Sequence, residues 1–183
     1  TSRDPQPPPS AYVKVSGGLF RDMMIHDLDM ARYLLPEEPT QVFATGSALV
    51  DPAIGEAGDV DTAMVILRTP SGRLAHIDNS RRASYGYDQR IEAFGQKGML
   101  QANNPTPTAL VATTDAGRTG DKPFHFFLER YAAAYRAELE HFLAVLNSGA
   151  APLVTGEDGR RALALADAAN ESLRSGRMVE VRS

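Results

Sequence analysis

The segment from residue 41 to residue 113 constrains the fold most, because it alternates short apolar runs with turn-forming residues, as successive β-strands do. Residues 62–68, TAMVILR, are apolar at nearly every position, as in a strand that is covered on both faces. A Pro-Ser-Gly turn then predicts a hairpin with residues 73–84. The remaining predictions are strands at residues 41–50, 89–95 and 98–102, a last strand of the meander at 109–113, and a loop at 51–61.

Helical patterns flank these strands. Residues 19–35 carry apolar side chains at helical spacing and stop at Pro36. Residues 124–148 and 157–175 are predicted as two further helices, and residues 178–181 as a short closing strand. This order predicts an α+β fold, with an open, mostly antiparallel sheet and helices packed on one face. Since the other face would expose apolar strands, we expect it to form the interface of a symmetric homo-oligomer.

The composition excludes several classes of function. Among 183 residues there is no cysteine, which excludes disulfides, thiolate metal sites and cysteine nucleophiles. The net charge of −4 offers no broad basic surface, so nucleic acid is not an expected partner. The sequence has no apolar run long enough for a membrane span, and its polar start is unlike a signal peptide. We therefore expect a cytoplasmic protein that does not interact with membranes.

The first eleven residues predict a connector between domains. They contain Pro5, Pro7, Pro8 and Pro9, a composition that favours semi-rigid, extended polyproline structure. A short extended stretch is expected next, at residues 12–15. Because the chain starts inside this linker-like segment and not on a methionine, we expect the amino-terminal part of a longer protein to be missing from it.

Asp22 and His26 are the candidates for catalytic chemistry. They stand four residues apart in the predicted helix, so their side chains share one face. A carboxylate one turn from an imidazole can orient the ring and stabilise the imidazolium that forms when the ring accepts a proton. Gly17 and Gly18, just before the helix, allow a ligand or another backbone segment to come close. The pattern is typical of an acid–base pair.

Two other interpretations of this helix stay open. The pair can be an ordinary surface contact that stabilises the helix by about a few tenths of a kcal/mol. Asp22, His26, Asp27 and Asp29 can also be considered as metal ligands. Against this, Asp27 and Asp29 point away from the shared face of the predicted helix, and no other cluster of histidines or cysteines supplies ligands.

Polar and aromatic side chains gather at the end of the predicted strand 73–84 and beyond it. The residues are Arg81, Arg82, Tyr85, Tyr87 and Arg90. They could bind hydroxyls or an anion, but a solvated sheet rim is the commoner explanation. His76 is interpreted as structural, and Phe126, Phe127, Tyr131 and Tyr135 are interpreted as core and pocket wall. The sequence has no G-x-G-x-x-G, P-loop or G-x-S-x-G motif. On its own, it offers an acid–base pair without a cofactor site.

Several long segments resemble the carboxy-terminal domain of the glucose–fructose oxidoreductase/inositol dehydrogenase/MocA family, and within it the inositol dehydrogenases. The resemblance covers essentially the whole chain. It is carried by SGGLFRDMMIHDLDMARYLL (16–35), QVFATGSALVDPAIGEAGDVDTAMV (41–65), IDNSRRASYGYDQRIEAFGQKG (77–98) and FLERYAAAYRAELEHF (127–142). It implies that residues 1–11 are a linker, or the end of a missing Rossmann domain. Residues 12–183 would then form the substrate-binding and oligomerisation domain.

The resemblance also implies an activity and roles for three residues. The family's D-x-x-x-H pair matches Asp22 and His26. His26 would accept the proton of the substrate hydroxyl while hydride leaves for NAD, and Asp22 would hold a substrate hydroxyl and tune the histidine. Tyr85 would line the polyol pocket. NADP is an alternative to NAD, and either cofactor would be bound mainly by the absent Rossmann domain, which also carries the catalytic lysine of the family.

The implied reaction is oxidation of a ring hydroxyl of inositol, from myo-inositol to 2-keto-inositol. One alternative is a dehydrogenase for another polyol or sugar, such as scyllo-inositol or a pyranose, because single hydrogen bonds to hydroxyls can decide substrate choice. A second alternative is a non-catalytic module for sugar binding or dimerisation. The resemblance implies a homo-oligomer, a dimer or a tetramer, and we expect the chain alone to be inactive.

Overall fold

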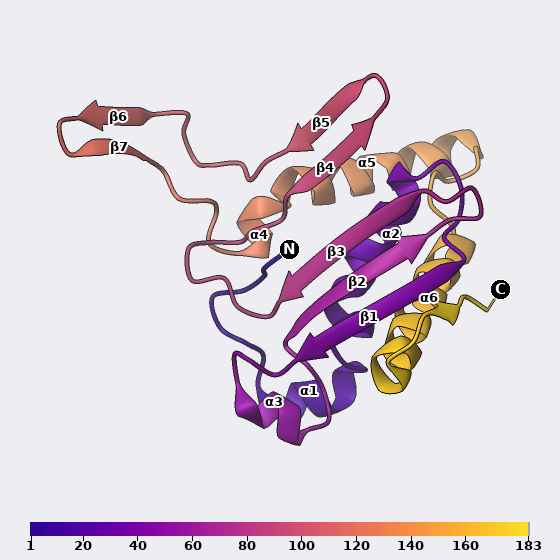
Figure 1. Cartoon of the computed structure of the whole chain (residues 1–183). Coiled ribbons are helices and arrows are strands. Elements are labelled where there is room, and N and C mark those ends of the chain that lie inside the picture. Colours follow the sequence, from indigo (N-terminus) through magenta and orange to yellow (C-terminus); the bar gives the residue numbers. More distant parts are fainter. Residues whose placement is uncertain (183) are drawn as a thin grey trace. The chain divides into compact units, whose positions relative to one another are not determined.

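The computed structural model describes residues 1–182 and divides them into two compact units. The first, which we call the sheet unit, contains Thr1, residues 7–81 and the chain from Val154 onward. The second, the hairpin unit, contains residues 2–6 and 82–153. Each unit has its own strands and helices (Figure 1).

The sheet unit is built on a four-stranded antiparallel sheet with the strand order β3-β2-β1-β8. Its strands are β1 (Gln41–Ser47), β2 (Thr62–Arg68), β3 (Leu74–Ser80) and β8 (Val179–Glu180). Every residue of β2 pairs with both neighbouring strands, so β2 is the central strand of the three long ones. The hairpin between residues 62–68 and 73–84 and the closing strand are therefore confirmed.

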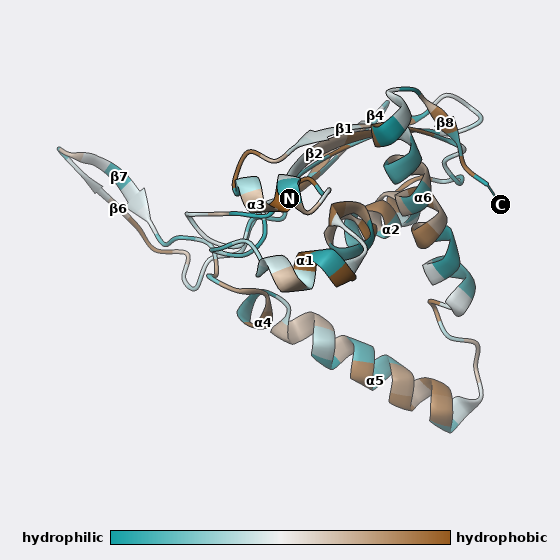
Figure 2. Ribbon diagram, turned by 90° about the horizontal axis from the view of Figure 1, so that it is seen from below, coloured by the Kyte–Doolittle hydropathy of each residue, from teal (hydrophilic) through white to brown (hydrophobic). Residues whose placement is uncertain are grey.

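Three helical segments cover one face of this sheet. They are a π-helix, η1 (Phe20–Met24), followed directly by α2 (Ile25–Leu34), and α6 (Gly156–Ser175) (Figure 2). Alternate residues of β2 point into the core beneath the helices, including Val65 and Leu67. The core is completed by Leu19, Phe20, Met23, Met24, Leu28, Val42, Ala44, Ala63, Ile77 and Leu165. The predicted α+β fold with helices on one face is confirmed.

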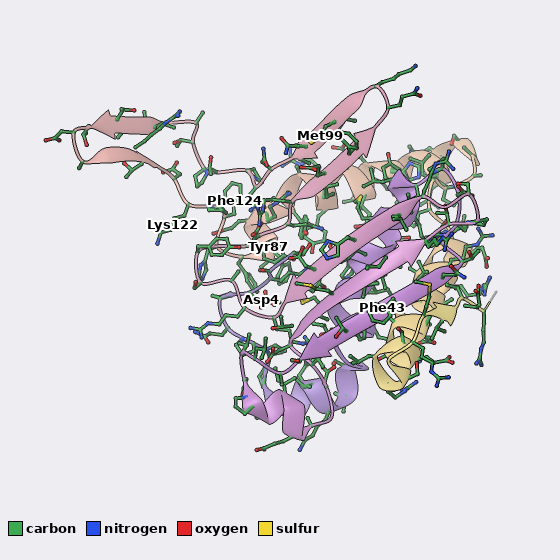
Figure 3. All side chains as sticks on the ribbon, in the orientation of Figure 1. Asp4, Phe43, Tyr87, Met99, Lys122 and Phe124 are labelled. Carbon is green, nitrogen blue, oxygen red and sulfur yellow. The ribbon has the colours of Figure 1, made fainter. Side chains whose placement is uncertain are left out.

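The opposite face of the sheet carries apolar side chains that this chain leaves partly open. Phe43, Ile66 and His76 lie side by side across β1, β2 and β3, and Met64 lies one pleat further along β2. Met64 is 53% exposed and Ile66 40%. Figure 3 shows Phe43 on this open face. Residues 62–68 therefore alternate between buried and exposed positions, and the prediction that the strand is covered on both faces is not met within this chain.

Two segments predicted as extended or loop are helical. Residues 12–15 belong to α1 (Ser10–Ser16), where the N–H groups of Tyr12 and Val13 donate to the Pro9 carbonyl at 2.9 and 3.2 Å and the Val13 side chain is buried. Within residues 51–61 lies α3 (Pro52–Glu56), where the Asp51 carboxylate accepts a hydrogen bond from the Ala53 N–H at 2.9 Å. The prediction of a loop over residues 51–61 is therefore wrong at Pro52–Glu56, because a capping carboxylate followed by proline favours the start of a helix.

The hairpin unit contains two separate two-stranded ribbons, β4 (Ile91–Gly95) with β5 (Gly98–Ala102), and β6 (Val111–Thr114) with β7 (Gly117–Gly120). The first ribbon is confirmed. The prediction that residues 109–113 end the meander is wrong, because a tight turn before Gly117, at φ 122°, pairs β6 with β7 instead.

The predicted helix at residues 124–148 is interrupted. It consists of α4 (Phe127–Arg130) and α5 (Ala132–Ser148), with a break at Tyr131. The interpretation of Phe126, Phe127, Tyr131 and Tyr135 as core is wrong, because none of them is buried. Tyr131 instead packs edge-on against Tyr87, with ring centroids 5.6 Å apart. None of the helices within residues 1–182 has the length and apolar character needed to cross a bilayer.

Candidate active site

Asp22 and His26 lie on consecutive turns of one helical segment in the sheet unit. Asp22 lies within η1, and His26 is the second residue of α2. A π-helical turn adds one residue to the hydrogen-bonded ring, and such turns are frequent at functional sites. Gly17 and Gly18, both with left-handed φ angles of 89° and 84°, lead the backbone into this segment. His26 is exposed, so its ring is accessible, whereas Asp22 is partly buried.

Both carboxylate oxygens of Asp22 accept hydrogen bonds from other elements of the sheet unit. The Tyr12 hydroxyl, on α1, donates to Oδ1 at 2.6 Å. The Arg81 Nη1, just after β3, donates to Oδ2 at 2.8 Å. The bond to Asp22 raises the pKa of Tyr12 above its ordinary value, so Tyr12 stays a hydrogen-bond donor at neutral pH. The orientation of the Asp22 carboxylate is thus fixed from two sides.

Arg81 connects Asp22 to a second carboxylate. Its side chain is only 4% exposed, and its Nη2 lies 3.5 Å from an oxygen of Asp59, in the loop before β2. The other oxygen of Asp59 accepts the Leu19 N–H at 3.0 Å, directly before η1. We call Tyr12, Asp22, Asp59 and Arg81 the Asp22–Arg81 cluster. It joins the start and the middle of the π-helical turn to the end of β3.

Arg81 is buried although its sequence neighbours are typical of a solvated rim. The interpretation of residues 81–90 as a solvated rim is wrong for Arg81 and Tyr87, which are buried, while Arg82 and Arg90 are exposed. Asp59 and Tyr12 were not singled out at all. Asp59 belongs to a short acidic loop that looks like ordinary solvated sequence. Only the three-dimensional fold brings Asp59 into contact with Arg81, 22 positions further along the chain.

Tyr85 belongs to the hairpin unit and is half exposed. Its hydroxyl donates to the Asp88 carboxylate, and this bond raises the pKa of Tyr85 above its ordinary value. Asp88 also accepts bonds from Arg90 at 2.8 and 2.9 Å and from Asn104 at 2.6 Å. Tyr85 is therefore part of an ordered polar cluster in its own unit. Its role toward a substrate stays a prediction.

The acidic residues of the helix have partners that account for them individually. Asp27 is buried and accepts bonds from the Thr1 hydroxyl at 2.9 Å and the Asn79 amide at 3.0 Å. Asp29 forms an ion pair with Arg32 at 2.8 Å. Within residues 1–182, no three side chains of histidine, cysteine, aspartate or glutamate are grouped so that they could hold a metal ion. The structure therefore offers no support for the metal interpretation of this helix.

The chain is an α+β domain with an open antiparallel sheet and helices on one face. The helical segment before the first strand carries Asp22 and His26. The Asp22–Arg81 cluster lies where strand β3 ends. The sequence model of the GFO/IDH/MocA C-terminal domain matches residues 1–101. The chain belongs to this family, and the predicted resemblance is confirmed.

Individual relatives match almost the whole chain. The myo-inositol 2-dehydrogenase of Thermotoga maritima is 56% identical over 181 residues, which cover 99% of this chain and 54% of that protein. The crystal structure of a myo-inositol dehydrogenase from Corynebacterium glutamicum has a TM-score of 0.93 and 48% identity, covering 99% of this chain and 54% of that one. For the scyllo-inositol dehydrogenase of Lactobacillus casei with bound NAD(H) and scyllo-inositol, the TM-score is 0.83, the identity 30% and the coverage 92% and 49%. The chain thus spans about half the length of these relatives.

Proposed function

We propose that this chain is the substrate-binding and proton-accepting half of an NAD-dependent dehydrogenase that oxidises myo-inositol to 2-keto-inositol. The observation that carries the proposal is the Asp22–His26 pair, with both oxygens of Asp22 held by donors, on a domain 56% identical to a protein named myo-inositol 2-dehydrogenase. Exposed His26 is accessible to a substrate hydroxyl, and Asp22 is held next to it in the helix.

The proposed reaction separates a proton from a hydride. His26 accepts the proton of the ring hydroxyl as a general base, and the hydrogen on the same carbon leaves as hydride, so that the C–O bond becomes a ketone. Each Asp22 oxygen already accepts one hydrogen bond and keeps further acceptor capacity. That capacity allows Asp22 to hold a neighbouring substrate hydroxyl and to favour the imidazolium form of His26.

The hydride acceptor is proposed to be NAD, with NADP as the alternative. The scyllo-inositol dehydrogenase of Lactobacillus casei, which was crystallised with NAD(H), supports a nicotinamide cofactor. Dinucleotide-binding folds hold the pyrophosphate where a parallel strand leads into a helix. All strand pairs of the described residues are antiparallel, so this chain does not itself fit the cofactor. We propose that a preceding Rossmann domain binds it and that residues 1–11 connect the two domains.

We further propose that Tyr85 contributes to the polyol pocket and that the open sheet face is covered by a second copy of the chain. The open face presents Phe43, Met64 and Ile66 in adjacent positions, and contiguous apolar surface of this kind marks interaction sites. Replacing Ile66 by glutamate should convert the oligomer into monomers, as measured by sedimentation velocity. Arg174→Gln, at an exposed position at the end of α6, is the matched control. If Ile66→Glu leaves the sedimentation coefficient unchanged, the sheet face is not the interface.

The test of the function is NADH formation, followed at 340 nm, by the longer protein that contains this chain, with myo-inositol as substrate and the chain alone assayed beside it. We expect activity from the longer protein and none from the chain alone. If the longer protein oxidises no polyol, the alternative of a non-catalytic sugar-binding or dimerisation module replaces the dehydrogenase.

A second candidate substrate is scyllo-inositol, because the Lactobacillus casei relative was crystallised with it. The two inositols differ in the configuration at one carbon, so hydrogen bonds to that hydroxyl decide between them. The same assay with scyllo-inositol and with pyranoses orders the substrates by kcat/KM. A larger value for scyllo-inositol or for a pyranose than for myo-inositol would contradict the first choice while leaving the reaction type intact.

A further inference from the structure

We propose that Arg81 is a positioning residue, which holds the Asp22 carboxylate in place and, through it, sets how readily His26 accepts a proton. This inference rests on the proposed function of Asp22 and His26. It concerns a residue outside the motif that contains them, 59 positions further along the chain.

The backbone of Arg81 is held in place by a hydrogen bond of its own. Its N–H donates to the Asp61 carbonyl at 2.8 Å. The Asp61 side chain is fully buried and accepts the N–H groups of three consecutive residues, 49–51, at 2.8 to 2.9 Å. The loop before β2, to which the Arg81 backbone is bonded, is therefore held by several hydrogen bonds to the Asp61 carboxylate. A side chain that starts from such a point has few orientations available.

The guanidinium lies between two carboxylates. Nη1 bonds Asp22 at 2.8 Å, and Nη2 is 3.5 Å from Asp59, while the buried Nε has no acceptor among residues 1–182. Asp59 in turn accepts the Leu19 N–H. The planar fork of arginine can serve both carboxylates at once, which the point charge of lysine cannot do equally well. Arg81 thus connects Asp22, one turn before His26, through Asp59 to the Leu19 N–H at the start of the π-helical turn.

Gly18, just before the π-helical turn, leaves room for the Asp59 carboxylate. Gly18 has a φ of 84°, and a Cβ atom at this position would lie 2.9 Å from a carboxylate oxygen of Asp59. A side chain there would push Asp59 away from both the Leu19 N–H and Arg81. The absence of a side chain at Gly18 therefore lets Asp59 bond Arg81, which in turn bonds Asp22.

A merely structural ion pair would stabilise the fold without changing the proton affinity of His26. A positioning role predicts more, because the cation of Arg81 partly neutralises Asp22. Without it, the charge of Asp22 would act more fully on the imidazolium and raise the titration midpoint of His26. Other charged or titratable groups near this turn include Tyr12 from α1, Asp59 from the loop before β2, and the Arg21–Asp167 ion pair between η1 and α6. On α2 they include Asp27, bonded to Asn79, and Asp29, paired with Arg32.

The experiment is an NMR titration of the imidazole groups in the 183-residue chain. It contains four histidines, and the His26→Gln variant assigns the signal of interest. We expect Arg81→Gln to raise the midpoint of His26 by roughly half a pH unit or more, and Arg81→Lys to raise it less. Asp22→Asn should lower it. Arg174→Gln removes one exposed positive charge from the end of α6 and should leave the midpoint unchanged.

An unchanged midpoint in folded Arg81→Gln, or an equal shift in Arg174→Gln, overturns the proposal. Amide spectra establish whether each variant is folded. If Arg81→Gln does not fold, Arg81→Met takes its place, because it removes the charge while keeping an unbranched side chain, and an unchanged midpoint there overturns the proposal equally. Kinetics of the longer protein add a second readout, a fall in kcat of about tenfold or more with little change in KM. If the unmodified longer protein oxidises no inositol, the proposed function fails, while the titration still decides the link from Arg81 to His26.

Discussion

The two units bury apolar surface very differently. In the sheet unit, residues from η1, α2, α6 and three strands form one continuous core, with Leu28, Val65 and Leu67 fully buried. In the hairpin unit, α5 has no buried residue and the four strands are exposed along most of their length. Its buried side chains are Arg3, Ala83, Tyr87 and Asp88. The sheet unit is thus stabilised mainly by apolar packing, and the hairpin unit mainly by polar contacts.

This difference bears on how the side chains of the Asp22–Arg81 cluster are held in place. A general base needs a fixed orientation, and side chains positioned by a packed scaffold provide it. Every member of the cluster starts from an element or loop of the sheet unit, whose core fixes the backbone. Tyr85, by contrast, depends on hydrogen bonds around Asp88 for its position. The two units should therefore respond differently to equivalent substitutions.

The largest expected effect is on stability. Leu28→Ala removes a fully buried side chain from the core of the sheet unit and should lower the free energy of unfolding by about 2–5 kcal/mol. Leu139→Ala, on α5 and 58% exposed, is the matched substitution in the hairpin unit and should cost less than about 0.5 kcal/mol. Urea unfolding followed by circular dichroism measures both. Equal costs would mean that α5 is packed as tightly as α2, although none of its residues is buried.

The next effect is on turnover. In the longer protein, His26→Ala should lower kcat by at least about a hundredfold, the scale of general base catalysis. His125→Ala, at an exposed position in the hairpin unit, is the control and should leave kcat within about twofold. NADH formation with myo-inositol measures both variants. Turnover of His26→Ala near that of the unmodified protein would remove His26 from the mechanism and would leave the chemistry without an assigned base in the sheet unit.

The sequence predicted best those elements whose pattern is local. A continuous apolar run predicted β2, turn residues predicted its hairpin with β3 and the β4–β5 ribbon, and Gly176 marked the end of α6. Helix α3 was missed, although its signal was local, because a short capped turn between strands looks like a loop. The pairing of β6 with β7 was missed because exposed strands have little hydrophobic alternation from which to predict them.

The candidate site was predictable only in part, for a similar reason. Asp22 and His26 are neighbours on one helix, so their spacing alone indicates a shared face. Arg81 and Asp59 join them through contacts between residues 22 to 59 positions apart, and no period in the sequence encodes such contacts. A buried arginine also cannot be told from a surface one by its neighbours in sequence. Its burial follows from where β3 ends over the π-helical turn.

The smallest effect concerns the polar cluster that stabilises the hairpin unit. Burial tends to raise the pKa of Asp88, but the bonds donated by Arg90, Tyr85 and Asn104 outweigh it and lower the pKa to about 2. A carboxyl with a lowered pKa stabilises the fold above its unfolded pKa, and this contribution is lost as the pH falls through the folded value. Asp88 should therefore add roughly 2 kcal/mol of stability to the hairpin unit at neutral pH, lost between about pH 4 and pH 2.

Hydrogen exchange of amides, measured at several pH values, separates this contribution from that of the sheet unit. Asp88→Asn should reduce protection of the Tyr87 N–H, which bonds the Phe124 carbonyl at 2.7 Å, and should flatten its dependence on pH in the acidic range (Figure 3). Asp115→Asn, at the exposed turn between β6 and β7, is the matched control and should change neither. Protection in β2 should be the same in all three proteins, because the apolar core of the sheet unit contains no part of the Asp88 cluster. If Asp88→Asn weakened β2 as much as the hairpin unit, the two units would unfold as one, and the distinction between apolar and polar stabilisation would not hold.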